Sequence, residues 1–460
     1  MSDMLDRRIL NRAAEHAAEF LDSLPTRPVA PRFTRQELLK ILATPLSDNG
    51  EDGVGVLDAL AAAGEGGALG TAGPRFFGFV IGGSLPVAVG ADWLTSAWDQ
   101  NAGLYAASPV TSVIEDVARE WLLDLFDLPR ESGIGFVTGC QMANFTGLAA
   151  ARHAVLRDAG WNVEEQGLQG APRINVVIGA EAHVTIHVAL RMLGLGSKNA
   201  VVVPADEEGR MRPDALRSAL SGLEGPTIVC VQAGNVNSGA FDPLAEIAEI
   251  AHGRGAWLHV DGAFGLWARA SRKYAHLAKG IELADSWATD AHKWLNVPYD
   301  CGVAIVRDAA AQRAAMTSSA AYLVQTKGTE RDNLDWGPEF SRRGRGVTVY
   351  AALRTLGRNG VEALVDRCCA HAERFAKLLA QDPRVKILND VVLNQVLVRF
   401  SDSDEVTRET IARIQRDGTC WLGGSSWQGR GVMRISVSNW ATSEEDIERS
   451  AEAVLRSIPG

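Results

Sequence analysis

The sequence of 460 residues lacks several features that would place it in a special class of protein. Its six cysteines show no C-x-x-C spacing, which argues against a zinc cluster and against a disulfide framework. No run of like charge accompanies the formal net charge of −10, and no stretch of about 18 uncharged apolar residues could span a bilayer. Residues 1–20 mix charges of both signs with apolar residues at helical spacing and show no secretion signal. These absences predict a cytoplasmic protein that binds neither nucleic acid nor membranes.

What the sequence contains is the composition of an ordinary folded protein, with 22% charged and 46% hydrophobic residues. A chain of this length exceeds the size at which one hydrophobic core keeps growing, so one large and one smaller domain are expected. The patterns along the chain predict an N-terminal arm at residues 1–75, a large domain at residues 76–335 and a small C-terminal domain at residues 336–460.

Seven short β-rich runs recur in the central part of the chain, and they begin at Ile134, Ile174, Ala200, Thr227, Ala256, Ser286 and Cys301. Most are nearly continuous in apolar residues, which is typical of strands covered on both faces, and helical patterns separate several of them. Only residues 296–300 join the last two runs, which is too short for a parallel crossover. The sequence therefore predicts an α/β fold with a seven-stranded, mainly parallel sheet, one antiparallel strand and helices on both faces.

The segments on either side of these strands have different patterns. Residues 1–75 look helical and then loop-like, with a proline-rich break at residues 26–33 and an Ala/Gly-rich stretch at residues 61–73 that is expected to be mobile or an extended linker. After Trp336 come a long helical pattern, two strand-like pieces and a closing helix with S-E-E-D near its start, at residues 347–381, 391–400, 432–439 and from 443 onward. These patterns predict an N-terminal helical arm and a smaller C-terminal α+β domain.

Ligands in open α/β sheets bind outside the carboxyl ends of the strands, and the first of these ends leads into a glycine turn. Gly139, Cys140 and Gln141 connect the first strand to a helical segment. A glycine there lets the backbone approach a ligand, and a helix N-terminus presents free N–H groups to an anion such as phosphate. A tight turn without a ligand is the alternative.

Two further strand ends carry ionisable side chains. Asp261 closes the fifth run, where a carboxylate needs a cationic or hydrogen-bonding partner; an N-cap for the next helix is the alternative. Lys293 follows the sixth run beside His292, and a partly desolvated lysine has its ammonium form disfavoured, which makes it an amine nucleophile; a surface lysine is the alternative. An anion cradle, an acid for a cationic ring nitrogen and a Schiff-base lysine together match the needs of pyridoxal 5′-phosphate (PLP).

Six motifs occur in a familiar order: R-F-F-G-F from Arg75, A-S-P-V-T from Ala107, T-G-C-Q-M-A-N from Thr138, A-E-A-H-V-T from Ala180, H-V-D-G-A-F-G from His259 and T-D-A-H-K-W-L-N-V-P from Thr289. From about Pro74 onward the chain resembles the group II PLP-dependent decarboxylases, which include the aromatic-amino-acid and glutamate decarboxylases. The resemblance implies a fold-type-I architecture and a site at the interface of a homodimer. It implies decarboxylation of an L-amino acid to the amine and CO₂.

The resemblance also implies a role for each matching residue. Lys293 would form the Schiff base with PLP, Asp261 would face the pyridinium nitrogen, and His183 and Ala263 would lie against the two faces of the ring. The positions expected near the phosphate are Gly139, Cys140, Gln141, Asp290 and His292. His187 forms an H-x-x-x-H pair with His183, but no third ligand follows in suitable context, so no metal site is predicted.

Arg434 falls at the position of the family's carboxylate-binding arginine, with a structural strand arginine as the alternative. Four aromatic residues are candidates for a substrate pocket or for the core, namely Phe76, Phe77, Trp93 and Trp98.

The chain departs from the family pattern in two places. The family has a second glycine and a Ser or Thr where this chain has Cys140 and Gln141, although backbone N–H groups can still bind a phosphate. The segment between Tyr322 and Trp336 matches the catalytic loop but contains no tyrosine to protonate the α-carbon. Decarboxylative aldehyde formation, a carbon–carbon lyase or aminotransferase reaction, and a cofactor-binding protein with a decayed site therefore stay open beside amine formation.

Overall fold

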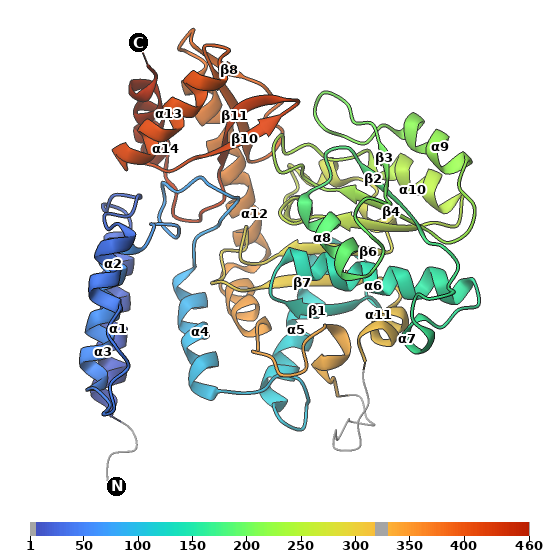
Figure 1. Ribbon diagram of the computed structural model, residues 1–460, viewed down its shortest axis with the longest axis horizontal. Coiled ribbons are helices and arrows are strands. Elements are labelled where there is room, and N and C mark those ends of the chain that lie inside the picture. Colours follow the sequence, from blue (N-terminus) through green and yellow to red (C-terminus); the bar gives the residue numbers. More distant parts are fainter. Residues whose placement is uncertain (1–5, 318–329, 460) are drawn as a thin grey trace.

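A seven-stranded sheet occupies the centre of the protein, whose computed structural model describes residues 6–317 and 330–459 (Figure 1). The strands lie in the order β1-β7-β6-β5-β4-β2-β3. Strand β7 is antiparallel to β1 and β6, and the other neighbouring strands are parallel. The strands are β1 (Gly133–Val137), β2 (Asn175–Gly179), β3 (Val201–Val203), β4 (Thr227–Gln232), β5 (Trp257–Asp261), β6 (Ser286–Asp290) and β7 (Gly302–Val306). The prediction of seven strands with the seventh antiparallel is confirmed.

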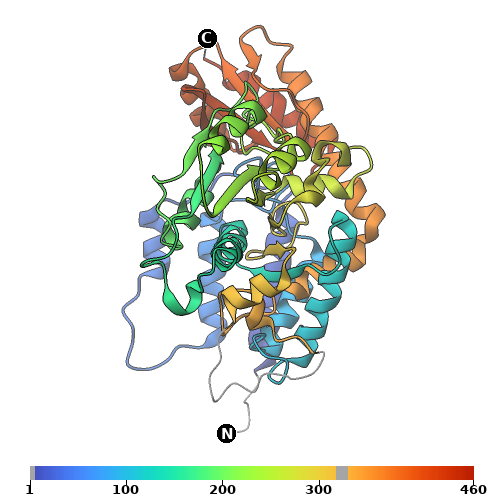
Figure 2. The same cartoon turned by 90° about the vertical axis from the view of Figure 1, so that its right-hand side faces the viewer.

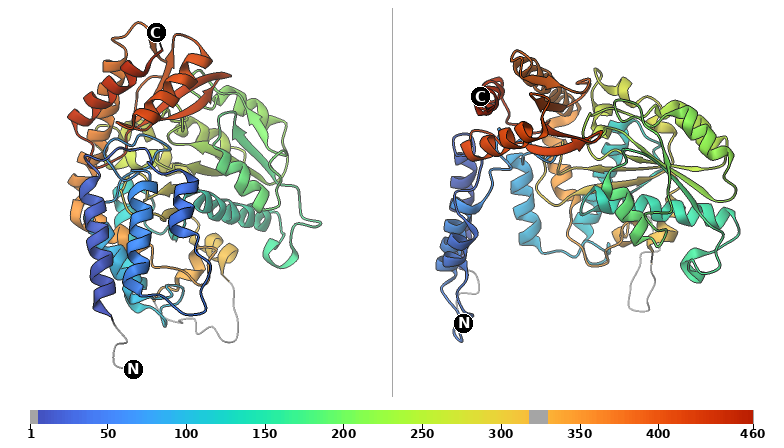
Figure 3. Two further views of the ribbon diagram at one scale, coloured as in Figure 1. Left: turned by 60° about the vertical axis from the view of Figure 1, so that its left-hand side comes forward. Right: turned by 45° about the horizontal axis from the view of Figure 1, so that its top comes forward.

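Helices cover both faces of this sheet, as the views in Figures 1 and 3 show. Side chains alternate between the faces of a strand, so Ile228 and Trp257 pack with α6, α8 and α11, whereas Val229 and Leu258 pack on the opposite face with α5, α9, α10 and α12. The bounds are α5 (Pro109–Phe126), α6 (Cys140–Asp158), α8 (Val184–Met192), α9 (Pro213–Ser221), α10 (Leu244–His252), α11 (Ala309–Met316) and α12 (Gly346–Leu379). Every residue of β1, β4, β5, β6 and β7 is buried, which explains their continuous apolar runs.

Short helical turns complete the connections around the sheet. One is the α-helical turn α7 (Val163–Gln166), and the 3₁₀ turns are η1 (Gly265–Ala270), η2 (Ala275–Ala278), η3 (Ile281–Leu283) and η4 (Asn333–Trp336). Three residues separate β5 from turn η1, which packs against α5 and α12 and so fixes the segment that follows Asp261.

A second sheet of four antiparallel strands lies in the C-terminal part of the chain, at one end of the molecule (Figure 2). Its order is β10-β11-β9-β8, with β8 (Val385–Ile387), β9 (Gln395–Phe400), β10 (Gly423–Trp427) and β11 (Arg430–Ser436). Helices α13 (Asp404–Asp417) and α14 (Glu444–Ser457) accompany it, and Ser443 and Asp446 form a capping box at the start of α14. Strands β8 and β10 were not predicted, because β8 has only three residues and the β10 sequence G-G-S-S-W has little apolar pattern.

The N-terminal part forms the helices α1 (Arg7–Ser23), α2 (Arg35–Leu42) and α3 (Gly53–Gly67), which stand beside α4 (Pro86–Trp98) in Figure 1. The expectation of a mobile or extended segment at residues 61–73 was wrong for residues 61–67, which form the C-terminal half of α3. Helix α3 contacts α1 and α2, and Ala63 and Gly66 are buried there, so the small residues permit close packing. Within residues 6–317 and 330–459, no helix has both the length and the apolar character needed to cross a bilayer.

Candidate active site

Two buried carboxylates mark the carboxyl ends of neighbouring parallel strands. Asp261 ends β5 and is 5% exposed, and Asp290 ends β6 and is 2% exposed. Asp261 pairs with Ala288 in the ladder, so Asp290 extends two residues further along the same edge. The turn after β6 then delivers His292 and Lys293. The sheet topology therefore brings together strand ends that the sequence separates.

Asp290 lies among positively polarised groups. Its Oδ2 is 2.9 Å from Nζ of Lys293, and its Oδ1 is 3.3 Å from Nε2 of His292 and accepts a 2.5 Å hydrogen bond from the backbone N–H of Cys140. The backbone N–H of Cys301 donates to Nδ1 of His292 at 3.2 Å. Burial lowers the pKa of His292, so the ring is neutral and carries its proton on Nε2, facing Asp290.

Lys293 is not the neutral amine that burial alone predicts. Burial disfavours its ammonium form, but the Asp290 carboxylate, together with Cys140 and Asp261, outweighs this effect, so the pKa of Lys293 lies above its ordinary value. The side chain is only 18% exposed, which also contradicts the alternative of a surface lysine. The expectation was wrong because it considered desolvation without the ion pair.

Asp261 has a different set of partners, all of them neutral. Its Oδ1 is 3.5 Å from Sγ of Cys140 and accepts a 3.2 Å hydrogen bond from the backbone N–H of Ala263, and its Oδ2 accepts one of 3.2 Å from Nδ2 of Asn144. Within the described part of the chain it forms no ion pair. The N-cap alternative is wrong, because Phe264 holds that position of the next turn. A buried carboxylate without a cation is costly, so this arrangement suits a cationic ligand.

The N-terminus of α6 lies beside both carboxylates. Gly139 is its N-cap residue without a side-chain cap, and the backbone N–H groups of Gln141 and Met142 have no hydrogen-bond acceptor among the described residues. The side chain of Gln141 is exposed. A β-carbon at Gly302 would lie 2.4 Å from the carbonyl carbon of Gly139, so β7 and this turn touch through their glycines. Free N–H groups at a helix start can bind a phosphate.

His183 and Arg434 come from two other elements. His183 is the N-cap of α8 and is half-buried, and burial lowers the pKa of its imidazole. Arg434, on β11, is close enough for its charge to lower the pKa of His183 further. Burial lowers the pKa of Arg434, which forms no ion pair or hydrogen bond with its side chain anywhere in residues 6–317 and 330–459. A half-buried guanidinium without a carboxylate partner is a plausible receptor for a substrate carboxylate.

The aromatic candidates divide into core and surface residues. Phe76 and Phe77 are each 1% exposed, and Phe76 stacks on Trp421 with ring centroids 5.0 Å apart. Trp93 and Trp98 lie on α4 and are 46% and 39% exposed. The two phenylalanines therefore belong to the core.

Three residues near the site were missed by the sequence reasoning. They are Asn144, Thr185 and His259, which connect to Asp261 and His183 by hydrogen bonds. Two signals were present in the sequence: Asn144 is one helical turn after Cys140, and His259 is two residues before Asp261 and thus on the same face of β5. No group of three His, Cys, Asp or Glu side chains in the described residues could hold a metal ion.

Comparison with known proteins identifies the family. The conserved domain of the pyridoxal-dependent decarboxylases matches residues 68–401. The chain belongs to this family. Tryptophan decarboxylase 1 of Oryza sativa subsp. japonica is 27% identical over an alignment that covers 98% of this chain and 93% of the relative. Phenylacetaldehyde synthase of Arabidopsis thaliana is 25% identical, with 94% and 91% covered.

Solved structures agree with this assignment. A crystal structure of Oryza sativa TDC with PLP and tryptamine matches with a TM-score of 0.91 at 25% identity, covering 99% of both chains. The protein is thus a PLP-dependent amino acid decarboxylase, a carboxy-lyase with the fold-type-I architecture. The resemblance seen in the sequence is confirmed in fold, cofactor and reaction class. Of the predicted catalytic loop between Tyr322 and Trp336, the part up to residue 329 lies outside the described residues.

The side chains present suit PLP, which carries an aldehyde, a phosphate and a ring nitrogen that becomes cationic on protonation. Lys293 offers an amine, and the start of α6 offers free N–H groups. Asp261 offers a buried negative charge that no cation of the described chain balances.

Proposed function

We propose that this enzyme converts an L-amino acid to the corresponding amine and CO₂, with PLP bound through Lys293. The observation that carries the proposal is the buried carboxylate of Asp261, which has only neutral partners and lies on the same sheet edge as Lys293. PLP, when bound, supplies an electron sink for the bond between the α-carbon and the carboxylate. The protein supplies the binding, the orientation and the charges.

Each binding role is assigned to a group with the matching chemistry. Lys293 holds the aldehyde end, Asp261 the ring nitrogen, and the start of α6 the phosphate, with Asp290 and His292 beside it. We assign the two faces of the ring to His183 and Ala263, and the phosphate contacts to Gly139, Cys140 and Gln141. A carboxylate about 4 Å from a cationic nitrogen contributes roughly 4 kcal/mol at an effective dielectric constant of about 20. That contribution keeps the ring nitrogen protonated, which strengthens the electron sink.

Arg434 is assigned to the substrate carboxylate. Its guanidinium is half-buried on β11, without a partner among the described side chains, and its charge reaches His183. A planar guanidinium can bind a carboxylate through two parallel hydrogen bonds and so fix its direction. The carboxylate must stand perpendicular to the ring for its bond to overlap with the ring's π system, so such a contact helps to select the bond that breaks.

The test is a panel of L-amino acids scored for products. Equal amounts of CO₂ and amine are expected from the true substrate, and Lys293→Ala should abolish both them and the visible absorbance of the bound cofactor. Keto acid without CO₂ would indicate an aminotransferase, and cleavage of another carbon–carbon bond would indicate a different lyase. A stable cofactor band that no amino acid perturbs would indicate a decayed site.

A second candidate is decarboxylative aldehyde synthesis. The loop between Tyr322 and Trp336 contains no tyrosine, and an Arabidopsis thaliana phenylacetaldehyde synthase is 25% identical to this chain. In that reaction O₂ and water are consumed, and aldehyde, CO₂, ammonia and hydrogen peroxide are formed. Formation of hydrogen peroxide in amounts equal to CO₂ would identify the enzyme as an aldehyde synthase and rule out the first candidate.

We further propose that the enzyme is a homodimer of the cytoplasm, with the site at the subunit interface. Helix α4 exposes Val87, Trp93, Leu94 and Trp98, and an apolar face of this kind marks a partner surface. The six cysteines are free and buried, which fits a reducing compartment. Light scattering on the wild type and on Leu94→Asp tests the dimer, since the introduced charge should yield monomers.

We also propose domain boundaries near residues 75 and 335, which separate the N-terminal arm, the large domain and the small domain.

A further inference from the structure

A chain of hydrogen bonds runs through the interior behind Asp261. Trp257 Nε1 donates to Ser286 Oγ at 2.9 Å, Ser286 Oγ is 2.8 Å from His259 Nδ1, and His259 Nε2 is 2.9 Å from Asn144 Oδ1. An amide oxygen can only accept, so His259 donates from Nε2 to Asn144 Oδ1, and Nδ1 of the neutral ring accepts the proton of Ser286 Oγ. Burial lowers the pKa of His259 to about 4, so the ring is neutral and its single proton lies on Nε2. That proton is donated to Asn144.

The side-chain amide nitrogen of Asn144 donates to two acceptors. Its Nδ2 donates to Asp261 Oδ2 at 3.2 Å and to Thr185 Oγ1 at 3.3 Å. Because an ionised carboxylate only accepts, the orientation of the amide is fixed from this side as well. Thr185 Oγ1 lies 2.8 Å from His183 Nδ1, and the backbone N–H of Thr185 donates to the same nitrogen at 3.4 Å. Nδ1 of His183 is thus an acceptor, and the neutral ring carries its proton on Nε2.

We propose that Asn144 is a positioning residue that couples the two halves of the active site. It donates to the carboxylate that faces the ring nitrogen, and through Thr185 it holds His183 in the Nε2–H tautomer. This inference rests on the proposed roles of Asp261 and His183. Nε2 of His183 has no hydrogen-bond acceptor among the described residues, so in this tautomer its N–H is available to an anionic group of the substrate, which the lone pair of the other tautomer would repel.

The packing of α6 on the sheet sets this geometry. Cys140 and Asn144 are one turn apart on α6, and each meets a different oxygen of Asp261. The His259 ring lies directly against α6, where a β-carbon at Gly147 would come within 2.9 Å of its Cε1. The network therefore joins rigid elements, and a change at Asn144 is expected to reach His183 without moving the backbone.

The first experiment reads the tautomer of His183 in the cofactor-free protein. The chain has nine histidines, so ¹⁵N-histidine-labelled protein is compared with His183→Gln to assign the ring signals of His183. Wild type should show a protonated Nε2 and an unprotonated Nδ1. Thr185→Val and Asn144→Leu should give a mixture of tautomers, whereas Thr185→Ser, which keeps the hydroxyl, should match wild type. Equal melting temperatures separate this result from misfolding.

The second experiment uses the holoenzyme. Asn144→Leu and Thr185→Val should raise KM at least about tenfold with a smaller change in kcat, and Thr185→Ser should restore KM. A protonated Nδ1 in wild type, or a tautomer that Thr185→Val leaves unchanged, overturns the proposal. The readout in the cofactor-free protein is independent of the reaction, so a wrong assignment of substrate or product would leave that result standing.

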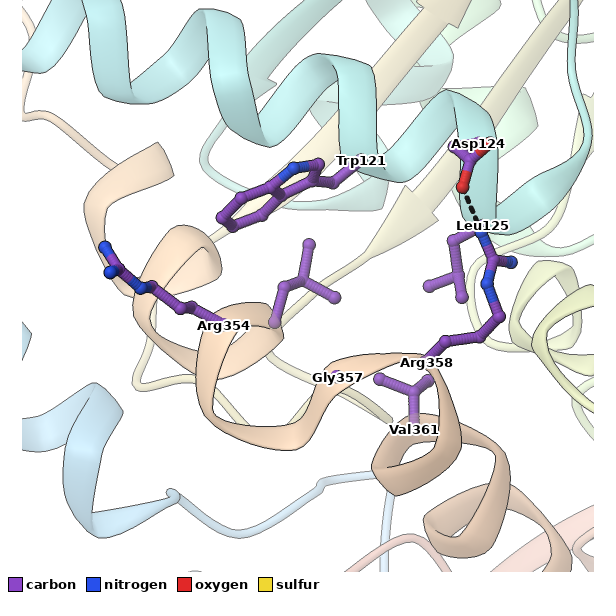
Figure 4. Close-up of a pocket in the computed structure, with 8 residues that line it drawn as sticks. Trp121, Asp124, Leu125, Arg354, Gly357, Arg358 and Val361 are labelled. Atoms are coloured by element: carbon purple, nitrogen blue, oxygen red, sulfur yellow. Dashed lines mark hydrogen bonds and ion pairs between the residues drawn. The ribbon is translucent and has the colours of Figure 1, made fainter.

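A separate feature carries a second inference. A cavity of about 320 Å³ lies between α5 and α12, and none of its lining residues belongs to the site above (Figure 4). It is lined by Trp121, Asp124, Leu125, Leu353, Arg354, Gly357, Arg358 and Val361. Helix α12 is interrupted at Gly357, with φ 60° and ψ 179°, and a β-carbon there would meet nothing within 4 Å. Crowding therefore does not explain this left-handed glycine, and the interruption leaves space beside α5.

The lining combines an aromatic face with cationic groups. The indole of Trp121 is stacked on Tyr350, with ring centroids 4.9 Å apart and planes at 17°. Arg358 is paired with Asp124, but Arg354 has no carboxylate partner in the described chain and donates only to Tyr350 Oη at 2.5 Å. We propose that this cavity binds a small aromatic carboxylate, with its ring near Trp121 and its anion on Arg354.

Calorimetry with indole-3-acetate as the probe tests this second site on the holoenzyme. Binding should weaken at least about tenfold in Arg354→Gln and for the uncharged indole-3-acetamide, and it should persist in Arg434→Gln, which removes the guanidinium assigned to substrate. Binding that is lost in Arg434→Gln and unchanged in Arg354→Gln places the probe in the active site and overturns the proposal. Absence of any binding overturns it too.

Discussion

Asp261 and Asp290 end neighbouring strands of one sheet, yet their carboxylates have opposite kinds of partner. Asp290 holds the ammonium of Lys293 at 2.9 Å and the N–H of His292 at 3.3 Å. Asp261 receives a thiol, an amide and a backbone N–H, all neutral. The first charge is balanced within the protein, and the second awaits a cation. Two aspartates of similar burial therefore differ in their charge environment, because α6 and the turn after β6 place different groups beside them.

The comparison teaches that burial alone does not reveal a cofactor site. Desolvation raises the free energy of both carboxylates, but only Asp290 recovers it through an ion pair in the described chain. In the proposed function, the protonated ring of the cofactor is the cation that offsets this cost at Asp261. Five variants or conditions test this difference, beginning with the largest expected effect.

Lys293→Ala removes the cation of Asp290 together with the amine that we propose binds the cofactor. Decarboxylation should fall by at least about 1,000-fold, because both covalent attachment and positioning are lost. The measurements are CO₂ release and the visible absorbance of the holoenzyme. Lys279→Ala is a matched control on the surface, and it should retain full activity.

Asp261→Asn removes the charge that we propose faces the ring nitrogen. Activity should fall about 100- to 1,000-fold, since the lost interaction is worth roughly 4 kcal/mol at most. The cofactor-free protein should unfold at the same urea concentration as wild type or a higher one, because an unbalanced buried charge has gone. A strongly destabilised protein without cofactor would contradict the account of Asp261.

Asp290→Asn should show the reverse pattern in the cofactor-free protein. Lys293 would be left buried without its counter-ion, which costs about 3 kcal/mol of unfolding free energy, and its pKa should fall. Because the folded pKa of Lys293 lies above its ordinary value, the pair stabilises fully at neutral pH and weakens only as the pH rises through the raised pKa. Urea unfolding at several neutral pH values should therefore show a constant deficit.

At acidic pH, protonation of His259 should weaken the hydrogen-bond network behind Asp261. The pKa of His259 falls from 6.5 to about 4 on folding, so its contribution is complete above pH 6.5 and is lost as the pH drops toward 4. The expected loss at about pH 4.5 is roughly 2–3 kcal/mol, measured by urea unfolding. In His259→Gln this part of the pH dependence should disappear, and an unchanged slope would refute the assignment.

Cys140→Ala should give the smallest effect. Burial and the two nearby carboxylates raise the pKa of the Cys140 thiol well above its usual value, so it serves as a neutral donor to Asp261 at 3.5 Å. Loss of one long hydrogen bond should cost about 0.5–1.5 kcal/mol of unfolding free energy and a few-fold in activity. Cys140→Ser keeps a donor and should lie closer to wild type in both assays.

Much of this arrangement could be predicted from the sequence, because parallel strands expose their carboxyl ends on one edge. Asp261 and Lys293 were found in that way, since each follows an apolar run, whereas Asp290 was assigned only through the family resemblance. The pKa of Lys293 was predicted wrongly, because its sign depends on whether the Asp290 oxygen reaches Nζ. Asn144 was missed, because its contact with Asp261 joins residues that are far apart in the chain.

The fold outside the site shows the same limit of prediction from sequence. Five of the seven strands are wholly buried, and apolar runs of this kind are explained by a sheet covered on both faces, so the number of strands could be predicted. The direction of the last strand could be predicted from the short connection that precedes it. Strand β10 has no such run, because it pairs with β11 through its backbone while its polar side chains stay partly exposed. Hydrogen bonding between backbones leaves little trace in composition.

The contact between Gly139 and Gly302 has a consequence for how this enzyme can vary. A β-carbon at Gly302 would lie 2.4 Å from the carbonyl carbon of Gly139, whereas a β-carbon at Gly139 would meet the His292 ring, 3.1 Å from its Cε1. Saturation libraries at Gly302 should therefore return almost only the parental codon. Chimeric proteins in which the segment around Gly139 is replaced should fold only when the replacing sequence also has a glycine at that position. Substitutions that change substrate preference are then expected at other residues of the site.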